Sequence, residues 1–135
     1  MGAFGVFFLD RWAPLAYILA MVERLITVAE TPVFVRQAKE VWTEDEHDEF
    51  VLYLAGNPEA GDLIPETGGV RKVRWKRAGS GKRGGVRVIY FYHDRDRPLY
   101  LLLVYAKGRQ EDLEPDEKRA VRELAAIIKG KRRKA

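Results

Sequence analysis

Hydrophobic and polar residues alternate along three segments in the second half of the chain, which is the pattern of half-buried β-strands. In the first segment, Lys72, Arg74 and Lys76 are expected to share one face. Val73 and Trp75 then share the other, so that one side of this strand is basic and the other apolar. The segments are residues 70–76, 86–92 and 99–107.

Short turns rich in glycine or charged residues separate these segments, and consecutive strands joined in this way predict an antiparallel meander. The same alternation divides the other two strands into faces. The second is expected to have Val88, Tyr90 and Tyr92 on one face and Arg87, Ile89 and Phe91 on the other. The third is expected to have Leu101, Leu103, Tyr105 and Lys107 together on one face.

Apolar residues at helical spacing predict two helices ahead of the meander. Thr31 is a suitable N-cap for the first helix, and Pro32 suits its first turn because the missing N–H has no partner there. Thr43 and Glu46 form a capping box that opens the second helix. Gly56 ends that helix.

A further strand is expected over residues 25–29 and a C-terminal helix from Pro115 to Gly130. The order of these elements predicts an α+β fold. In this fold an antiparallel sheet, made of the N-terminal strand and the three-stranded meander, packs against the two N-terminal helices and is followed by the C-terminal helix.

The length of 135 residues suits a single domain with its own hydrophobic core. Cysteine is absent, which excludes disulfides and thiol catalysis and fits the cytoplasm. His47 and His93 are far apart, and neither has a carboxylate at the spacing of a metal site. We therefore expect neither a metal nor a cofactor.

The N-terminal residues are apolar, but Asp10, Arg11 and Pro14 interrupt them, and the longest clean run is too short to span a bilayer. Three interpretations remain open: an amphipathic accessory helix, a partial membrane anchor, or a start codon placed too early, with initiation at Met21. No stable membrane association is expected. The expected division is a non-core extension of residues 1–20, a domain of residues 21–130 and a basic tail of residues 131–135.

Charge is distributed unevenly along the chain. Residues 23–66 contain eleven acidic and three basic residues, whereas residues 67–87 contain eight basic residues and no acid. Positive charge fixed on a sheet suits a polyanion, above all RNA. A solvated sheet face without a ligand is the alternative interpretation.

Three strings, one at each predicted strand, resemble those of the RelE/ParE toxin superfamily, and within it the HigB-like branch of RelE-type toxins. The resemblance extends over about residues 25–128. The strings are Gly68-Gly69-Val70-Arg71-Lys72-Val73-Arg74-Trp75, Gly85-Val86-Arg87-Val88-Ile89-Tyr90-Phe91-Tyr92 and Leu103-Val104-Tyr105-Ala106-Lys107.

This resemblance implies an mRNA interferase toxin of a type II toxin–antitoxin system. Such a toxin enters the ribosomal A site and cuts mRNA without a metal, through attack of the ribose 2′-OH on the adjacent phosphate. Its partner is expected to be an antitoxin that is a DNA-binding helix-turn-helix protein. The implied catalytic residues are Lys72, Arg74, Arg87, Tyr105 and Lys107. The basic hairpin itself predicts Arg71, Lys76, Arg77, Lys82 and Arg83 as RNA-binding residues, and the resemblance adds Arg109.

The chemistry of these side chains agrees with that implication. Arg87, expected to be exposed on its strand, can hold a phosphate through two N–H groups. Lys72 or Lys107 could move a proton if like charges crowd it, and Tyr105 could stack on a base. Two other classes remain open: a ParE-like inhibitor of DNA gyrase and a catalytically silent RNA-binding module.

Overall fold

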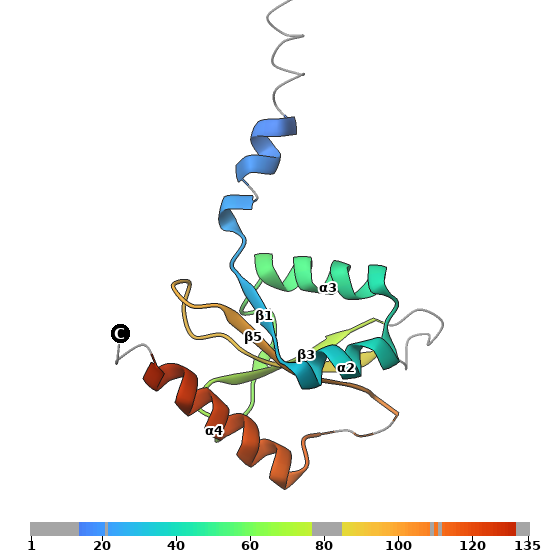
Figure 1. Cartoon of the computed structure of the whole chain (residues 1–135), viewed down its shortest axis with the longest axis vertical. Helices are drawn as coiled ribbons and strands as arrows, with labels where there is room; N and C mark the ends of the chain where they lie inside the picture. Colours follow the sequence, from blue (N-terminus) through green and yellow to red (C-terminus); the bar gives the residue numbers. More distant parts are fainter. Residues whose placement is uncertain (1–13, 21, 77–84, 109, 111, 132–135) are drawn as a thin grey trace, which may run out of the picture.

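The computed structural model describes residues 14–20, 22–76, 85–108, 110 and 112–131 (Figure 1). Helices and strands follow one another in the predicted order, which confirms the α+β class. The elements are β1 (Val28–Glu30), α2 (Pro32–Val41), α3 (Glu44–Gly56), β2 (Asp62–Leu63), β3 (Val70–Trp75), β4 (Val86–Phe91), β5 (Leu99–Ala106) and α4 (Pro115–Lys131).

The strands form one sheet in the order β1-β5-β4-β3-β2. Strands β3, β4 and β5 pair antiparallel, which confirms the predicted meander. Strand β1 instead pairs with β5 in parallel, so the prediction of an entirely antiparallel sheet is wrong at this edge. Parallel pairing needs a long crossover, and the chain between β1 and β5 supplies one.

Several predicted boundaries also change. The first strand is Val28–Glu30 and not residues 25–29, and the third meander strand ends at Ala106, one residue early. Helix α4 continues to Lys131, past Gly130. Strand β2 pairs with β3 but has only two residues, too few for alternation to reveal it.

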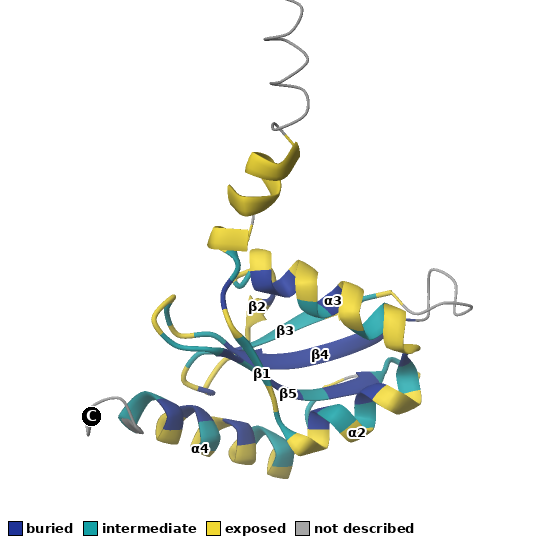
Figure 2. Cartoon of the chain, turned by 45° about the horizontal axis from the view of Figure 1, so that its top comes forward, coloured by how far each residue is buried: buried dark blue, intermediate teal, exposed yellow. Residues whose placement is uncertain are grey.

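Helices cover both faces of the sheet, so there are two layers of core (Figure 2). On one face, Phe34 of α2 and Phe50 of α3 are fully buried against the sheet. On the other face, Val121 and Ala125 of α4 pack against it. All six residues of the central strand β4 are buried as a result.

A β-bulge between β4 and β5 alters the faces of β5. Ile89 pairs with Leu103, whereas the next residue of β4 pairs with Leu101, so Leu102 has no direct opposite. Leu101 therefore packs under α2 and α3, while Leu103 and Tyr105 pack on the α4 side. The predicted common face of Leu101, Leu103 and Tyr105 is wrong, because one extra residue inverts the alternation.

The predicted caps are confirmed and one of them also joins two elements. The Oγ1 atom of Thr31 accepts a hydrogen bond from the N–H three residues on, and Pro32 lies in the first turn of α2. Thr43 and Glu46 form the reciprocal capping box of α3. The Thr31 hydroxyl also donates to the carbonyl of Leu102 at 3.2 Å, which connects α2 to β5.

Buried Tyr90 fixes the loop ahead of β2 against the sheet. Its hydroxyl accepts from the N–H of Gly61 and donates to the carbonyl of Pro58, both at 2.8 Å. Burial raises the pKa of Tyr90. A Cβ atom on Gly61 would lie 2.9 Å from the carbonyl oxygen of Lys72, so glycine allows the loop to approach β3 this closely.

Residues 14–20 and 22–24 are helical and exposed, and this helix extends away from the sheet (Figure 1). Among the described residues, no helix has both the length and the apolar composition needed to cross a membrane. The division of the chain at residues 20 and 130 stays a prediction. The exposed apolar side chains of the helix include Leu15, Tyr17, Ile18, Leu19 and Val22.

Candidate functional site

Three of the predicted catalytic residues form a row across the meander. Arg74 in β3 pairs with Arg87 in β4, and Arg87 pairs with Tyr105 in β5. Directly paired residues project from the same face with Cβ atoms about 4.5–5.5 Å apart. We call Arg74, Arg87 and Tyr105 the arginine row; it lies on the α4 side of the sheet. Like charges directly opposite destabilise a sheet, so this row favours a bound anion.

Arg87 is only 5% exposed, whereas Arg74 is exposed. The expectation of an exposed Arg87 is wrong, because β4 is the central strand and has a neighbour on each side. A guanidinium group held in such a position interacts more strongly with a nearby anion than one in water does. Arg87 is therefore a fixed source of positive charge at the middle of the row.

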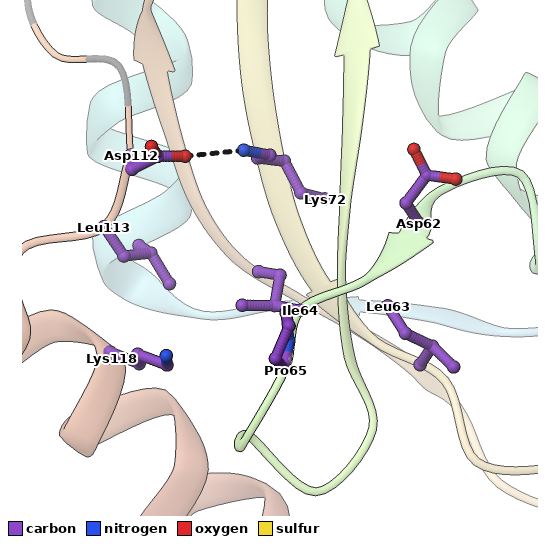
Figure 3. A pocket seen from close by; sticks show the side chains of 8 residues that line it. All are labelled: Asp62, Leu63, Ile64, Pro65, Lys72, Asp112, Leu113 and Lys118. Atoms are coloured by element: carbon purple, nitrogen blue, oxygen red, sulfur yellow. Dashed lines mark hydrogen bonds and ion pairs between the residues drawn. The ribbon is translucent and has the colours of Figure 1, made fainter.

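Lys72 lies on the same face of β3, two positions before Arg74. Its Nζ donates a hydrogen bond of 2.7 Å to Oδ1 of Asp112 (Figure 3). This bond and the lysine charge hold the pKa of Asp112 below its usual range, and the charge of Arg87 acts in the same direction. The Asp112 carboxylate thus forms an ion pair with Lys72 beside the arginine row.

Asp112 lies between β5 and α4, and hydrogen bonds of Gln110 connect it to α4. The side-chain amide of Gln110 donates to the carbonyl of Asp112 at 2.9 Å and to Oε1 of Glu117 at 3.1 Å. The same Glu117 oxygen accepts from the N–H of Glu114 at 2.9 Å, which caps α4. Sequence reasoning missed Asp112, because nothing in its acidic surroundings links it to Lys72, 40 residues earlier.

Two predicted RNA-binding residues are not brought to the row. Arg71 lies on the opposite face of β3, and its Nη1 donates to the carbonyl of Gly61 at 2.7 Å. Lys76 forms an ion pair of 3.0 Å with Glu49 of α3. The predicted common face of Lys76 and Arg74 is wrong, because the strand and its alternation stop one residue before Lys76.

Lys107 directly follows β5 and is partly exposed. Its N–H donates to the carbonyl of Gly85 at 3.2 Å. Gly85 has φ of +92°, and a Cβ atom there would lie 2.6 Å from the carbonyl oxygen of Trp75, so glycine is required at the start of β4. Lys107 thus lies at the Tyr105 end of β5. The predicted residues Arg77, Lys82, Arg83 and Arg109 lie outside the described part of the chain.

Hollows border the site on two sides. A polar one of about 550 Å³ lies between α2 and β5 and includes Tyr105 and Gln110. A second, of about 350 Å³, lies beside Lys72 between the β2–β3 pair and α4 (Figure 3). We call this second hollow the Lys72 pocket. It is lined by Asp62, Leu63, Ile64, Pro65, Lys72, Asp112, Leu113 and Lys118.

Together, the arginine row and Lys72 place three cationic side chains on one face of the sheet, with Tyr105 at one end of the row. The guanidinium groups can hold phosphate oxygens in a bidentate manner, and the ammonium adds a point charge. Within the described residues, no group of three or more His, Cys, Asp or Glu side chains could hold a metal ion. Positive charges fixed in this way can stabilise negative charge that develops on a phosphate.

Comparison with known protein families gives a match over most of the chain. The model of a family described as the RelE toxin of the RelE/RelB toxin–antitoxin system matches residues 28–135. This range contains the whole sheet, the arginine row and α4. The HigB-like subtype and the helix-turn-helix nature of the antitoxin stay predictions. The chain thus belongs to the RelE toxin family, and it is the toxin of a toxin–antitoxin system with a cognate antitoxin as its partner.

Proposed function

We propose that this toxin is an endoribonuclease that cuts mRNA in the ribosomal A site. The observation that carries the proposal is the arginine row, in which buried Arg87 lies between Arg74 and Tyr105. Lys72 adds a cation on the same face. Membership of the RelE family supports this function, because toxins of the family are generally endoribonucleases.

In the proposed step, the ribose 2′-oxygen bonds to the adjacent phosphorus and the bond from phosphorus to the 5′-oxygen breaks. The 2′-hydroxyl loses its proton and the 5′-oxygen gains one, so the products are a 2′,3′-cyclic phosphate and a 5′-hydroxyl. Negative charge spreads over the phosphate oxygens in the transition state. Cations fixed in advance stabilise this state more than the ground state.

Each side chain has a role that follows from its position. Arg87 holds the phosphate oxygens, because it is buried and central. Arg74 and Lys72 bind the same or the next phosphate from the exposed edge of the row. Tyr105 orients the reacting hydroxyl, and Lys107 adds positive charge where β5 ends.

Dependence on the ribosome is part of the proposal, for a geometric reason. The arginine row can accelerate the reaction only when the 2′-oxygen, the phosphorus and the leaving oxygen are in line. Free RNA rarely has this geometry, whereas a codon held in the A site has a fixed path. The ribosome then supplies the orientation and the toxin supplies the charge.

Mapping mRNA ends after induced expression tests this function. We expect growth arrest and new 5′ ends within translated frames, which disappear when translation is blocked. Arg74→Ala should reduce the yield of cuts at least about tenfold. Arg122→Ala, which changes an exposed arginine on α4 outside the row, should have no effect.

The other outcomes distinguish the remaining functions. Equal cleavage of naked and ribosome-bound RNA would contradict the dependence on the ribosome. Intact mRNA together with damaged DNA would support a ParE-like gyrase inhibitor. RNA binding without toxicity would support a silent RNA-binding module.

A further inference from the structure

The Lys72 pocket has no role in the reaction proposed above, apart from Lys72 itself. Figure 3 shows that its lining comes from the β2–β3 pair on one side and from α4 and its preceding loop on the other. Its walls include the apolar side chains of Ile64, Pro65 and Leu113. Charged groups line it as well: the amines of Lys72 and Lys118 and the carboxylates of Asp62 and Asp112.

The walls of this pocket are held by the fold. Ile64 and Leu113 pack against the core under α4, and the N–H of Ile64 donates to the carbonyl of Val70 at 2.8 Å. The Nζ of Lys118 donates to Glu66 at 3.3 Å. A volume of about 350 Å³ lies within the range of small-ligand sites, about 300–1,000 Å³. The pocket is thus formed before a ligand enters.

Apolar walls with hydrogen-bonding groups beside them suit a flat heterocycle, which buries its faces and keeps its polar edge paired. Lys72 belongs both to this pocket and to the face of the arginine row. Lys72 therefore connects the pocket to the face on which the phosphate is proposed to bind. We propose that the Lys72 pocket binds the base of a nucleotide next to the phosphate held by the arginine row, an inference that rests on the proposed endoribonuclease function.

The carboxylates predict which bases fit best. The carboxylate oxygens of Asp62 and Asp112 accept hydrogen bonds. Adenine, cytosine and guanine carry amino groups that donate, whereas uracil has a carbonyl oxygen where cytosine has its amino group. The pocket therefore favours a base with an amino group over uracil, which makes it a determinant of where the toxin cuts.

Methyl NMR of the full chain with small probes tests binding without relying on cleavage. Cytidine and uridine monophosphate form a matched pair, and ribose 5-phosphate lacks the base. We expect cytidine monophosphate to shift the methyl signals of Ile64 and Leu113 and to bind about threefold to tenfold more tightly than uridine monophosphate. Ribose 5-phosphate should leave both methyl signals unchanged.

Variants with matched controls locate the effect. Leu113→Ala should weaken cytidine monophosphate binding about threefold to tenfold, whereas Leu124→Ala, which removes a similar α4 side chain outside the pocket, should not. Replacing Asp62 and Asp112 together by asparagine should abolish the preference for cytidine over uridine monophosphate. The double control Glu114→Gln with Asp116→Asn changes two exposed acids outside the pocket. This variant should keep the preference for cytidine monophosphate.

Two results would overturn the pocket assignment whether or not the toxin cuts mRNA. One is equal binding of ribose 5-phosphate and cytidine monophosphate with unshifted Ile64 and Leu113 signals. The other is a Leu113→Ala protein, folded by its NMR spectrum, that binds cytidine monophosphate like the original. If the methyl shifts occur and mRNA stays intact, base binding in the Lys72 pocket is supported and the proposed endoribonuclease function is wrong.

Discussion

At the scale of single residues, burial changes the role of Arg87. Arg87→Lys keeps a positive charge in the central strand but loses the planar fork that binds two phosphate oxygens. We expect the yield of mRNA cuts, measured by primer extension, to fall at least about tenfold, while the free energy of unfolding in urea changes by at most about 1–2 kcal/mol. Arg74→Lys, at the exposed end of the row, should lower the yield of mRNA cuts less than Arg87→Lys does. Cutting at the original rate by Arg87→Lys would mean that charge alone is sufficient.

Asp112 gives a second prediction at this scale, on pH dependence. Because its pKa is lowered, its bond with Lys72 stabilises the fold above the ordinary aspartate pKa and is lost as pH falls through the lowered value. Lys72→Met should return the titration midpoint of the Asp112 carboxyl carbon, followed by NMR, toward its ordinary range. Lys118→Met, which removes the other amine of the pocket, should not. An unchanged midpoint in Lys72→Met would contradict the ion pair.

At the scale of elements, side chains of α2 and its N-cap form hydrogen bonds with backbone groups of β5 beyond the residues that pair with β1. The Thr31 hydroxyl donates to the carbonyl of Leu102, and Oε1 of Gln37 accepts from the N–H of Val104 at 3.0 Å. Thr31→Val loses the N-cap and this link, and should lower the free energy of unfolding by about 1–2 kcal/mol in urea. Thr43→Val loses only the cap of α3, so its cost should be smaller, about 1 kcal/mol. Equal costs would show that the link to β5 contributes nothing.

At the scale of the whole molecule, acidic α3 lies on one face of the sheet and the arginine row on the other. An antitoxin that blocks RNA most directly covers the arginine row, so we expect its binding to be salt-sensitive. Lys72→Glu with Lys118→Glu should slow association at least about tenfold in a surface-binding assay. Glu44→Lys with Asp48→Lys on α3 should leave the association rate unchanged. The reverse pattern would place the antitoxin on the helices.

The N-terminal helix gives another prediction for the whole molecule. Its exposed apolar side chains form a surface that favours self-association. Deleting residues 1–20 should lower light scattering of the purified toxin and leave toxicity unchanged. Substituting Tyr17 and Ile18 by serine in the full chain should also lower light scattering and leave toxicity unchanged. Loss of toxicity on deletion, with membrane association of the full chain, would instead support the anchor.

The sequence alone determined the features that depend on near neighbours in the chain. The Thr31 and Thr43 caps, the end of α3 at Gly56 and the three meander strands follow from local hydrogen bonding and from side-chain period, and the structure confirms them. Lys72, Arg74, Arg87 and Tyr105 could be placed on strands for the same reason.

Only the tertiary structure decided the features that depend on distant contacts. The parallel pairing of β1, the bulge at Leu102 and the burial of Arg87 follow from which strands become neighbours, and no local pattern encodes that choice. The pairing of Asp112 with Lys72, and the pocket beside them, arise because α4 folds back over the sheet. Charge and period are local properties, whereas the field at a phosphate is the sum over residues that folding brings together.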